Sequence, residues 1–282
     1  CRNLGRCPSL ATFRRQIAPV LVNLRDPTQA ITALSAVHIY WRRDVKRVAI
    51  VGCGFVADLY MRSFAVHPEI KVVACYDRDA ARLEAFCSHW GVTASASLEA
   101  VFAAAGGGLL LNLTNPRAHY EVNLGALEAG CHVFCEKPLA LTFAEAQELH
   151  DLANERGLQL GSAPSSVLGE AAQTLAFALK QGIGGTPRLV YAELDDNPIH
   201  IMDFESVCSP SGAPWPLKEE IYEGCTFEHV GYHLVWICAL LGPVEYVTAF
   251  SDELIENKMA GLPPKVGTPD YSVACLSFAN GA

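Results

Sequence analysis

The chain has 282 residues, of which 51% are hydrophobic and 18% are charged, and this composition excludes an intrinsically disordered protein. The formal net charge of −9 argues against nucleic acid or an anionic membrane surface as a partner, because both attract a basic surface. The apolar stretches are also too short to span a bilayer. The 11 cysteines are an odd number, and several lie within apolar runs, which favours free thiols in the reducing cytoplasm over a disulfide framework.

Residues 1–44 differ from the rest of the chain. They carry seven arginines, no lysine and only two acids, Asp26 and Asp44. An organelle transit peptide has an arginine-rich and acid-poor composition of this kind, but it is also rich in serine, which is scarce here. We therefore interpret this segment as an irregular N-terminal extension.

From Lys46 onward, apolar runs alternate with amphipathic segments, which is typical of an α/β domain with a parallel sheet. The runs predict strands over 47–51, 70–76, 109–113, 132–135 and 158–160. Helices are predicted after the glycine-rich turn that follows Val51, after Asp79 as N-cap, over 98–105, after Asn115-Pro116, and after a capping box at Thr142. In the last of these helices, Phe143, Ala146, Leu149, Leu152 and Ala153 are the expected buried face.

In the second half of the chain, predicted strands and helices no longer alternate regularly. Helices are expected over 169–181 and 228–241, and strands over 187–194, 244–250 and 272–278. Strands around few helices predict a second α/β domain with a large open, mostly antiparallel sheet. We therefore predict a dinucleotide-binding domain over 45–162 and a substrate and oligomerisation domain over 163–282.

The segment Gly52-Cys-Gly54-Phe55-Val56-Ala57 lies between a predicted strand and a predicted helix. It fits the GxGxxA dinucleotide fingerprint, in which the first glycine makes the tight turn and the second lets the backbone approach a pyrophosphate. The N–H groups at the start of the helix then face the phosphates.

Asp77 ends the second strand, 25 residues after Gly52, close to the spacing needed to bind the adenosine ribose hydroxyls. A carboxylate there favours NAD because it repels a 2′-phosphate. Arg78 could instead accept that phosphate, so NADP stays open.

Glu136-Lys137-Pro138 follows the strand 132–135, at the carboxyl edge where parallel sheets bind ligands. Together with the glycine turn and Asp77, the stretches 114–119 (Thr-Asn-Pro-x-x-His) and 126–138 (Ala-Leu-Glu-Ala-Gly-x-His-Val-x-x-Glu-Lys-Pro) resemble the Gfo/Idh/MocA oxidoreductases. These are the relatives of glucose–fructose oxidoreductase and inositol dehydrogenase, and the resemblance covers about residues 46–282.

The resemblance implies a Rossmann domain followed by an α/β domain whose open sheet shapes the substrate site and commonly mediates oligomerisation. It implies that Thr114, Asn115 and His119 line the dinucleotide and that Glu136 lies near the nicotinamide ribose. Lys137 matches the lysine beside the nicotinamide and the substrate hydroxyl.

The family's Asp-x-Gly-x-His motif corresponds here to His229-Val-Gly231-Tyr-His233, with His229 in place of the aspartate and Glu228 one residue before it. We include His229 and His233 with Lys137 as candidate catalytic residues. His229 and His233 at i and i+4 could also hold a metal, but their order is not HExxH and a third ligand is not evident, so no metal is predicted.

The expected function is an NAD(P)-dependent oxidoreductase that moves a hydride between the nicotinamide and a carbinol carbon of a sugar, cyclitol or related polyol. His233 would be the general base and Lys137 would polarise the oxygen. The alternatives are an NAD-dependent glycoside hydrolase of the same family and a non-catalytic NAD(P)- and sugar-binding regulator.

We expect a homo-oligomer in the full-length protein. The segment 270–281 resembles a strand leading into a hairpin, so we expect a C-terminally truncated member that is unstable on its own.

Overall fold

The structure is a computed structural model that describes residues 46–194 and 198–282, so the extension predicted over 1–44 lies outside the described residues. Its first sheet is five-stranded and parallel, in the order β2-β1-β3-β4-β5. The strands are β1 (Lys46–Val51), β2 (Ile70–Tyr76), β3 (Leu109–Asn112), β4 (His132–Cys135) and β5 (Leu160–Ser162). The strand order reverses at β1, which places a ligand crevice at the carboxyl ends of β1 and β3.

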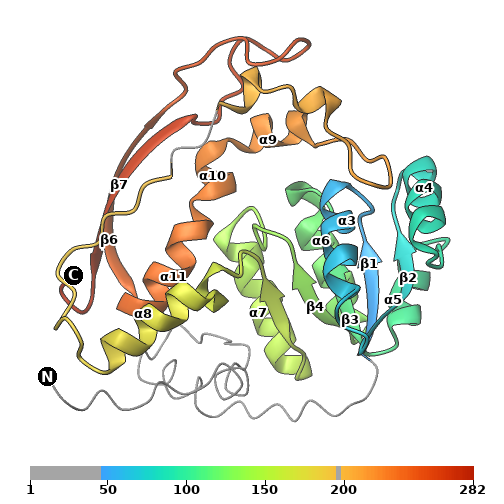
Figure 1. Cartoon of the computed structure of the whole chain (residues 1–282), viewed down its shortest axis with the longest axis horizontal. Helices are drawn as coiled ribbons and strands as arrows, with labels where there is room; N and C mark the ends of the chain where they lie inside the picture. Colours follow the sequence, from blue (N-terminus) through green and yellow to red (C-terminus); the bar gives the residue numbers. More distant parts are fainter. Residues whose placement is uncertain (1–45, 195–197) are drawn as a thin grey trace, which may run out of the picture.

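Helices cover both faces of this sheet (Figure 1). They are α3 (Phe55–Phe64), α4 (Ala80–Trp90), α5 (Leu98–Ala105), α6 (Pro116–Glu128) and α7 (Phe143–Arg156). Alternate β1 residues face opposite layers: Ala49 and Val51 pack toward α5, α6 and α7, whereas Val48 and Ile50 pack toward α3 and α4. The predicted Rossmann fold is thus confirmed. None of the helices over 46–194 and 198–282 is long and apolar enough to cross a membrane.

The helix starts follow the predicted capping chemistry. Asp79 accepts hydrogen bonds from the N–H groups of Ala81 and Arg82 at the start of α4. Thr142 and Glu145 form the full capping box of α7. The predicted buried face of α7 is wrong at Phe143, which is 81% exposed because it lies in the first turn, beyond the layer formed by Leu149 and Ala153.

The second half contains α8 (Glu170–Lys180), α9 (Leu217–Glu223), α10 (Cys225–His229), α11 (Gly231–Leu241), β6 (Val244–Asp252) and β7 (Tyr271–Phe278), with short 3₁₀ turns η1 (Ser166–Leu168), η2 (Ile199–Ile201) and η3 (Phe204–Ser206). The antiparallel character predicted for the sheet of this half is confirmed, but in the described residues the sheet is small and consists of two strands, β6 and β7. Ile237 and Leu241 of α11 pack against Phe278 of β7. Helices α10 and α11 therefore lie between the two sheets (Figure 1).

Two predicted elements of this half differ in the structure. The helix expected over 228–241 is divided, since α10 ends at His229 and α11 begins at Gly231, a residue with low helix propensity. Residues 187–194 form no strand, because this stretch pairs with no strand of the described residues. Leu189 and Tyr191, which are 74% and 85% exposed, also lack the burial that stabilises one.

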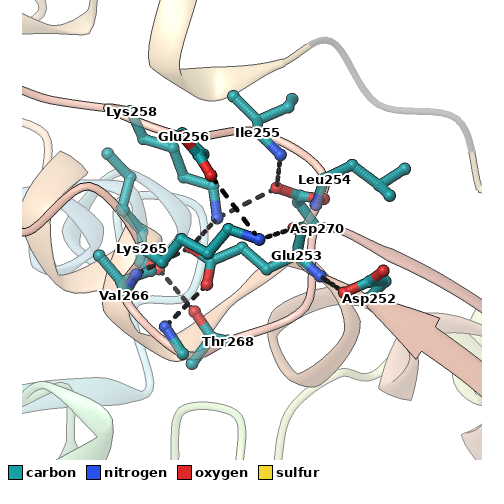
Figure 2. Close-up of polar contacts among 12 residues, drawn as sticks. Asp252, Glu253, Leu254, Ile255, Glu256, Lys258, Lys265, Val266, Thr268 and Asp270 are labelled. Atoms are coloured by element: carbon teal, nitrogen blue, oxygen red, sulfur yellow. Dashed lines mark hydrogen bonds and ion pairs between the residues drawn. The ribbon is translucent and has the colours of Figure 1, made fainter.

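The loop between β6 and β7 is organised by a buried ammonium (Figure 2). Lys258 Nζ lies 3.0 Å from Glu253 Oε1 and 3.1 Å from Asp270 Oδ2. The same carboxylates accept hydrogen bonds from the backbone N–H groups of Leu254, Ile255, Val266 and Gly267. The loop thereby has a defined conformation without regular secondary structure.

Candidate functional site

The glycine turn after β1 has two glycines with different physical roles. Gly52 has a φ of +95°, and a Cβ there would lie 2.5 Å from the backbone of Leu113, so only glycine fits against the end of β3. Gly54 is the N-cap of α3, without a side-chain cap, and a Cβ there would meet no atom within 4 Å. The N-terminus of α3 therefore opens at Gly54 with uncapped N–H groups, as an anion site requires.

Asp77 holds the end of β2 against this turn. Its carboxylate accepts hydrogen bonds from the N–H of Cys53 at 2.8 Å and the N–H of Asp79 at 2.8 Å, and it lies 3.6 Å from the guanidinium of Arg82. The carboxylate is almost fully buried, whereas the neighbouring Arg78 is exposed. Asp77 therefore fixes the turn and carries a negative charge at the position predicted for the adenosine ribose.

The first two residues of α3, Phe55 and Val56, are half-buried beside the turn. The Phe55 ring meets the ring of Trp215 edge-on, with centroids 4.8 Å apart. The second half of the chain thus reaches the residues that follow the fingerprint glycines.

A polar network follows β3. The Thr114 hydroxyl donates to Asn112 Oδ1 at 2.7 Å. His119 is fully buried, and its ring nitrogens lie 2.6 Å from the carbonyl oxygen of Pro138 and 2.9 Å from that of Thr114. Burial lowers the pKa of His119, against the opposing effect of these two carbonyls, so the neutral ring is favoured. His119 therefore links Thr114 to the segment that carries Lys137.

Asn115 is at the N-cap position of α6, as predicted, but its side chain makes no capping hydrogen bond. It lines a cavity of about 450 Å³ together with Arg78 from the end of β2 and residues of α6 and α9. This volume is within the range of small-molecule sites.

Glu136 and Lys137 follow β4, at the same edge of the sheet. Glu136 accepts hydrogen bonds from the Tyr60 hydroxyl at 2.7 Å and from the N–H of Lys137 at 3.1 Å. Burial, with Glu136 beside it, raises the pKa of Tyr60, so this phenol stays protonated as a donor. Lys137 Nζ forms an ion pair with Glu228. Burial lowers the pKa of Lys137, while Glu220 and Glu136 act in the opposite direction.

Glu228 is the carboxylate that the structure places against Lys137, and it is buried at the interface of the two halves. From the sequence, Glu228 was noticed only because it lies one residue before the position of the expected aspartate; its contact with Lys137 was not predicted. The signal that could have identified it is its charge, since a buried acid needs a partner and Lys137 is the cation that the resemblance brings to this place. His229 lies near Tyr232, with ring centroids 6.1 Å apart.

His233 lies in the first turn of α11. Its Nε2 is 3.0 Å from the carbonyl oxygen of Glu193, which fits an Nε2–H donor, and its ring meets Trp236 edge-on. Nδ1 is buried and has no hydrogen-bond partner within the described residues. In this tautomer, Nδ1 carries a lone pair that no donor of the described residues satisfies. Groups of three or more His, Cys, Asp or Glu that could hold a metal are not found among the residues described.

Comparison with known proteins finds a matching family for residues 46–163. Residues 46–163 match the model of the GFO_IDH_MocA family, described as an oxidoreductase family with an NAD-binding Rossmann fold. The match contains the glycine turn, Asp77 and Lys137.

A D-glucoside 3-dehydrogenase of Escherichia coli (strain K12) is 32% identical over 185 residues, which are 56% of this chain and 52% of that protein. A D-apiose dehydrogenase of Paraburkholderia graminis is 28% identical over 165 residues, 57% of this chain and 42% of the relative. The chain thus spans about half the length of these curated relatives.

Among solved structures, the WlbA dehydrogenase of Chromobacterium violaceum, in complex with NADH and UDP-GlcNAcA, has a TM-score of 0.65 at 20% identity, over 86% of this chain and 66% of that one. An oxidoreductase of Agrobacterium radiobacter, in complex with NAD⁺, L-tartaric acid and magnesium, has a TM-score of 0.64 at 18% identity, over 84% and 64% of the two chains. These likenesses show the shared fold.

Proposed function

We propose, from the membership of residues 46–163 in the Gfo/Idh/MocA oxidoreductase family, that this protein is an NAD(P)-dependent oxidoreductase. It transfers a hydride between the nicotinamide and a carbinol carbon of a sugar, cyclitol or related polyol. The observation that carries the proposal is Lys137, half-buried and paired with Glu228 at the carboxyl edge of the sheet that bears the glycine turn.

The residues present fit a nicotinamide dinucleotide, since the open N-terminus of α3 at Gly54 suits a pyrophosphate and Asp77 suits a ribose. We assign its binding to the turn, the ends of β2 to β4 and the start of α6, through Gly52, Gly54, Phe55, Val56, Asp77, Arg78, Thr114, Asn115, Glu136 and Lys137, with His119 supporting Thr114 from below. When bound, the nicotinamide supplies the hydride acceptor or donor. NAD is the preferred form, and the exposed Arg78 leaves NADP open.

The protein itself handles the proton and the charge on oxygen. In the oxidative direction, His233 accepts the hydroxyl proton, and the Lys137 ammonium stabilises the negative charge that develops on the oxygen. Glu228 holds Lys137 in place and favours its charged form. In the Asp-x-Gly-x-His motif, the aspartate position is taken here by His229, which has no carboxylate. We assign the role of that carboxylate to Glu228, one residue before it.

Kinetics of Lys137→Ala and His233→Ala test this assignment on a substrate found by screening sugars, cyclitols and glucosides for NADH formation. Each variant should lose about 10²–10⁴-fold in kcat/KM, as expected for a lost acid–base group. The proposal is wrong if both variants keep full turnover. Release of free sugar without net NADH would instead indicate a glycoside hydrolase, and ligand binding without turnover would indicate a regulator.

The assembly and compartment are further parts of the proposal. Exposed side chains on β6 and β7 support a homo-oligomer that forms through this sheet, because large exposed apolar areas mark interaction surfaces. The cytoplasm is supported by eight free cysteines among the described residues, five of them buried.

A further inference from the structure

We propose that residues 208–223, in the second half of the chain, form the outer wall of the site for the ADP half of the dinucleotide. This segment consists of a short turn over 208–216 followed by α9, and we call it the 208–223 wall. The inference rests on the proposed function and adds Ser211, Trp215, Lys218 and Tyr222 to its binding machinery. Two separate sets of contacts carry it, one beside the glycine turn and one beside the end of β2.

The first set fixes the 208–216 turn on α3. The Ser209 N–H donates to the Ala213 carbonyl oxygen, and the Gly212 N–H donates to the Ser209 carbonyl oxygen. The buried Ser209 hydroxyl accepts a third hydrogen bond, from the N–H of Ala213. This turn presents Ser211, whose hydroxyl donates to Asp58 Oδ2 at 2.6 Å. A short polar turn from the second half is thus joined to the helix that receives the pyrophosphate.

Asp58 is the anchor on the α3 side. It is fully buried, and its other oxygen accepts the indole N–H of Trp90 at 2.7 Å, from the end of α4. A buried carboxylate needs hydrogen-bond donors, and Ser211 supplies one of the two recorded here. Losing Ser211 would therefore leave Asp58 under-satisfied unless water enters, and the turn would be released from α3.

Trp215 places an aromatic surface beside the fingerprint. It lies between Phe55, at 4.8 Å edge-on, and Phe204, stacked at 5.1 Å. Its indole N–H is buried and has no partner within the described residues. These two ring contacts hold the Trp215 indole next to the start of α3.

The second set encloses the adenosine end. The cavity of about 450 Å³ is lined on one side by Arg78, Asn115 and Arg117, and on the other by Lys218 and Tyr222 of α9. Arg117 bridges the two sides through Glu223 at 3.2 Å and lies 5.9 Å over the Tyr222 ring. Aromatic and guanidinium faces of this kind suit a planar purine.

The position of this cavity identifies its occupant. It begins at Arg78, the residue after the acid that is expected to bind the adenosine ribose, and it borders Asn115 at the start of α6. Because Trp215 and α9 are only a few residues apart, one continuous segment covers both the pyrophosphate turn and the adenosine end. ADP-ribose, which lacks the nicotinamide, should therefore be sufficient to engage the wall.

The test measures binding of ADP-ribose and NADH to the full chain by calorimetry, with Ser211→Ala and Tyr222→Leu compared with Ser63→Ala. Ser63 is exposed on α3, and its hydroxyl donates to the carbonyl oxygen of Leu59 in the same helix. Because a hydrogen bond to a charged group is lost, Ser211→Ala should raise Kd about tenfold for both ligands. Tyr222→Leu should act in the same direction, and Ser63→Ala should match the unmodified protein.

A second measurement needs no variant. Saturating ADP-ribose should protect the exposed Lys218 from reductive methylation at least severalfold, while the exposed Lys180 on α8 reacts as before. If ADP-ribose binds but neither variant weakens it and Lys218 stays reactive, the 208–223 wall is wrong and the proposed function stands. If the unmodified protein binds neither NADH, NADPH nor ADP-ribose, the proposed function itself fails.

Discussion

At the scale of single residues, Gly52 and Gly54 show why two glycines in one turn are not equivalent. A Cβ at Gly52 would meet the backbone of Leu113 and Thr114, which cannot move aside without disturbing β3. Gly54 has an ordinary φ of −80° and open space around its Cα. The first glycine is required by the packing of the turn against β3, and we propose that the second admits the dinucleotide.

Gly54→Ala should therefore fold normally and bind poorly. Because its new methyl group meets no protein atom, the melting temperature should stay close to that of the unmodified chain, whereas the methyl should obstruct the pyrophosphate and weaken NADH binding at least tenfold. Calorimetry and thermal melts measure the two effects separately. Unchanged NADH affinity in this variant would argue against a pyrophosphate at the turn. Gly52→Ala is the comparison that should lose stability.

The Lys137–Glu228 pair makes a prediction about pH. Burial lowers the pKa of Lys137, and an adjacent carboxylate favours the ammonium form, so removing the charge of Glu228 should lower that pKa further. In Glu228→Gln, the alkaline limb of kcat/KM for oxidation should therefore move to lower pH, by about one pH unit. Glu84→Gln, an exposed residue of α4, is the control. A limb that stays in place or moves upward would contradict the pairing.

At the scale of elements, the helix boundaries of the first half were predictable because local chemistry sets them. Asp79, Thr142 and Pro116 each act within one turn of their own helix. The division of α10 from α11 at Val230 was not predicted, because apolar spacing continues across it. The Lys137–Glu228 contact joins residues 91 positions apart, and no local pattern encodes such a pair.

The β6–β7 loop depends on the ionisation of its central cluster. Hydrogen bonds from Val266 N–H and Lys258 lower the pKa of Glu253. Burial alone would raise the pKa of Asp270, but hydrogen bonds from Leu254, Ile255 and Lys258 outweigh it and lower the pKa. Lowered carboxyl pKa values stabilise the loop above the ordinary value of about 4, and this contribution is lost as the pH falls through the lowered values.

Lys258→Met should expose this dependence. Hydrogen-exchange protection of the Leu254, Ile255, Val266 and Gly267 amides should fall strongly in the variant at about pH 7, because two carboxylates then face each other without a cation. The difference from the unmodified protein should shrink at about pH 3, where carboxyls become protonated. Lys265→Met, which removes an exposed ammonium, should have a smaller effect. Equal differences at both pH values would contradict the role of the cluster shown in Figure 2.

At the scale of the whole molecule, the two halves were predictable to different degrees. The parallel sheet could be predicted because each strand is a short apolar run between helices, with β1 buried on both faces. In the second half, Val244 pairs with Phe278 across a long loop, and residues 187–194 have a strand-like composition without a strand partner in the described part. Burial and pairing, which decide strand formation there, are properties of the assembled fold.

The β6–β7 sheet leads to the prediction that concerns the molecule as a whole. Tyr246 and Phe250 are 73% and 69% exposed, and Val247 and Val273 are 61% and 52% exposed. Apolar side chains therefore face solvent on a sheet that has two strands within residues 46–194 and 198–282. Such a surface favours association.

We expect the 1–282 polypeptide to self-associate or aggregate in sedimentation experiments. The double variant Val247→Lys/Phe250→Lys should shift the distribution toward the monomer, because it places charges on both faces of the sheet. Val66→Lys, which changes an exposed valine beyond the end of α3, should not. A monodisperse, cooperatively melting monomer of the unmodified chain would show that this sheet is stable without a partner.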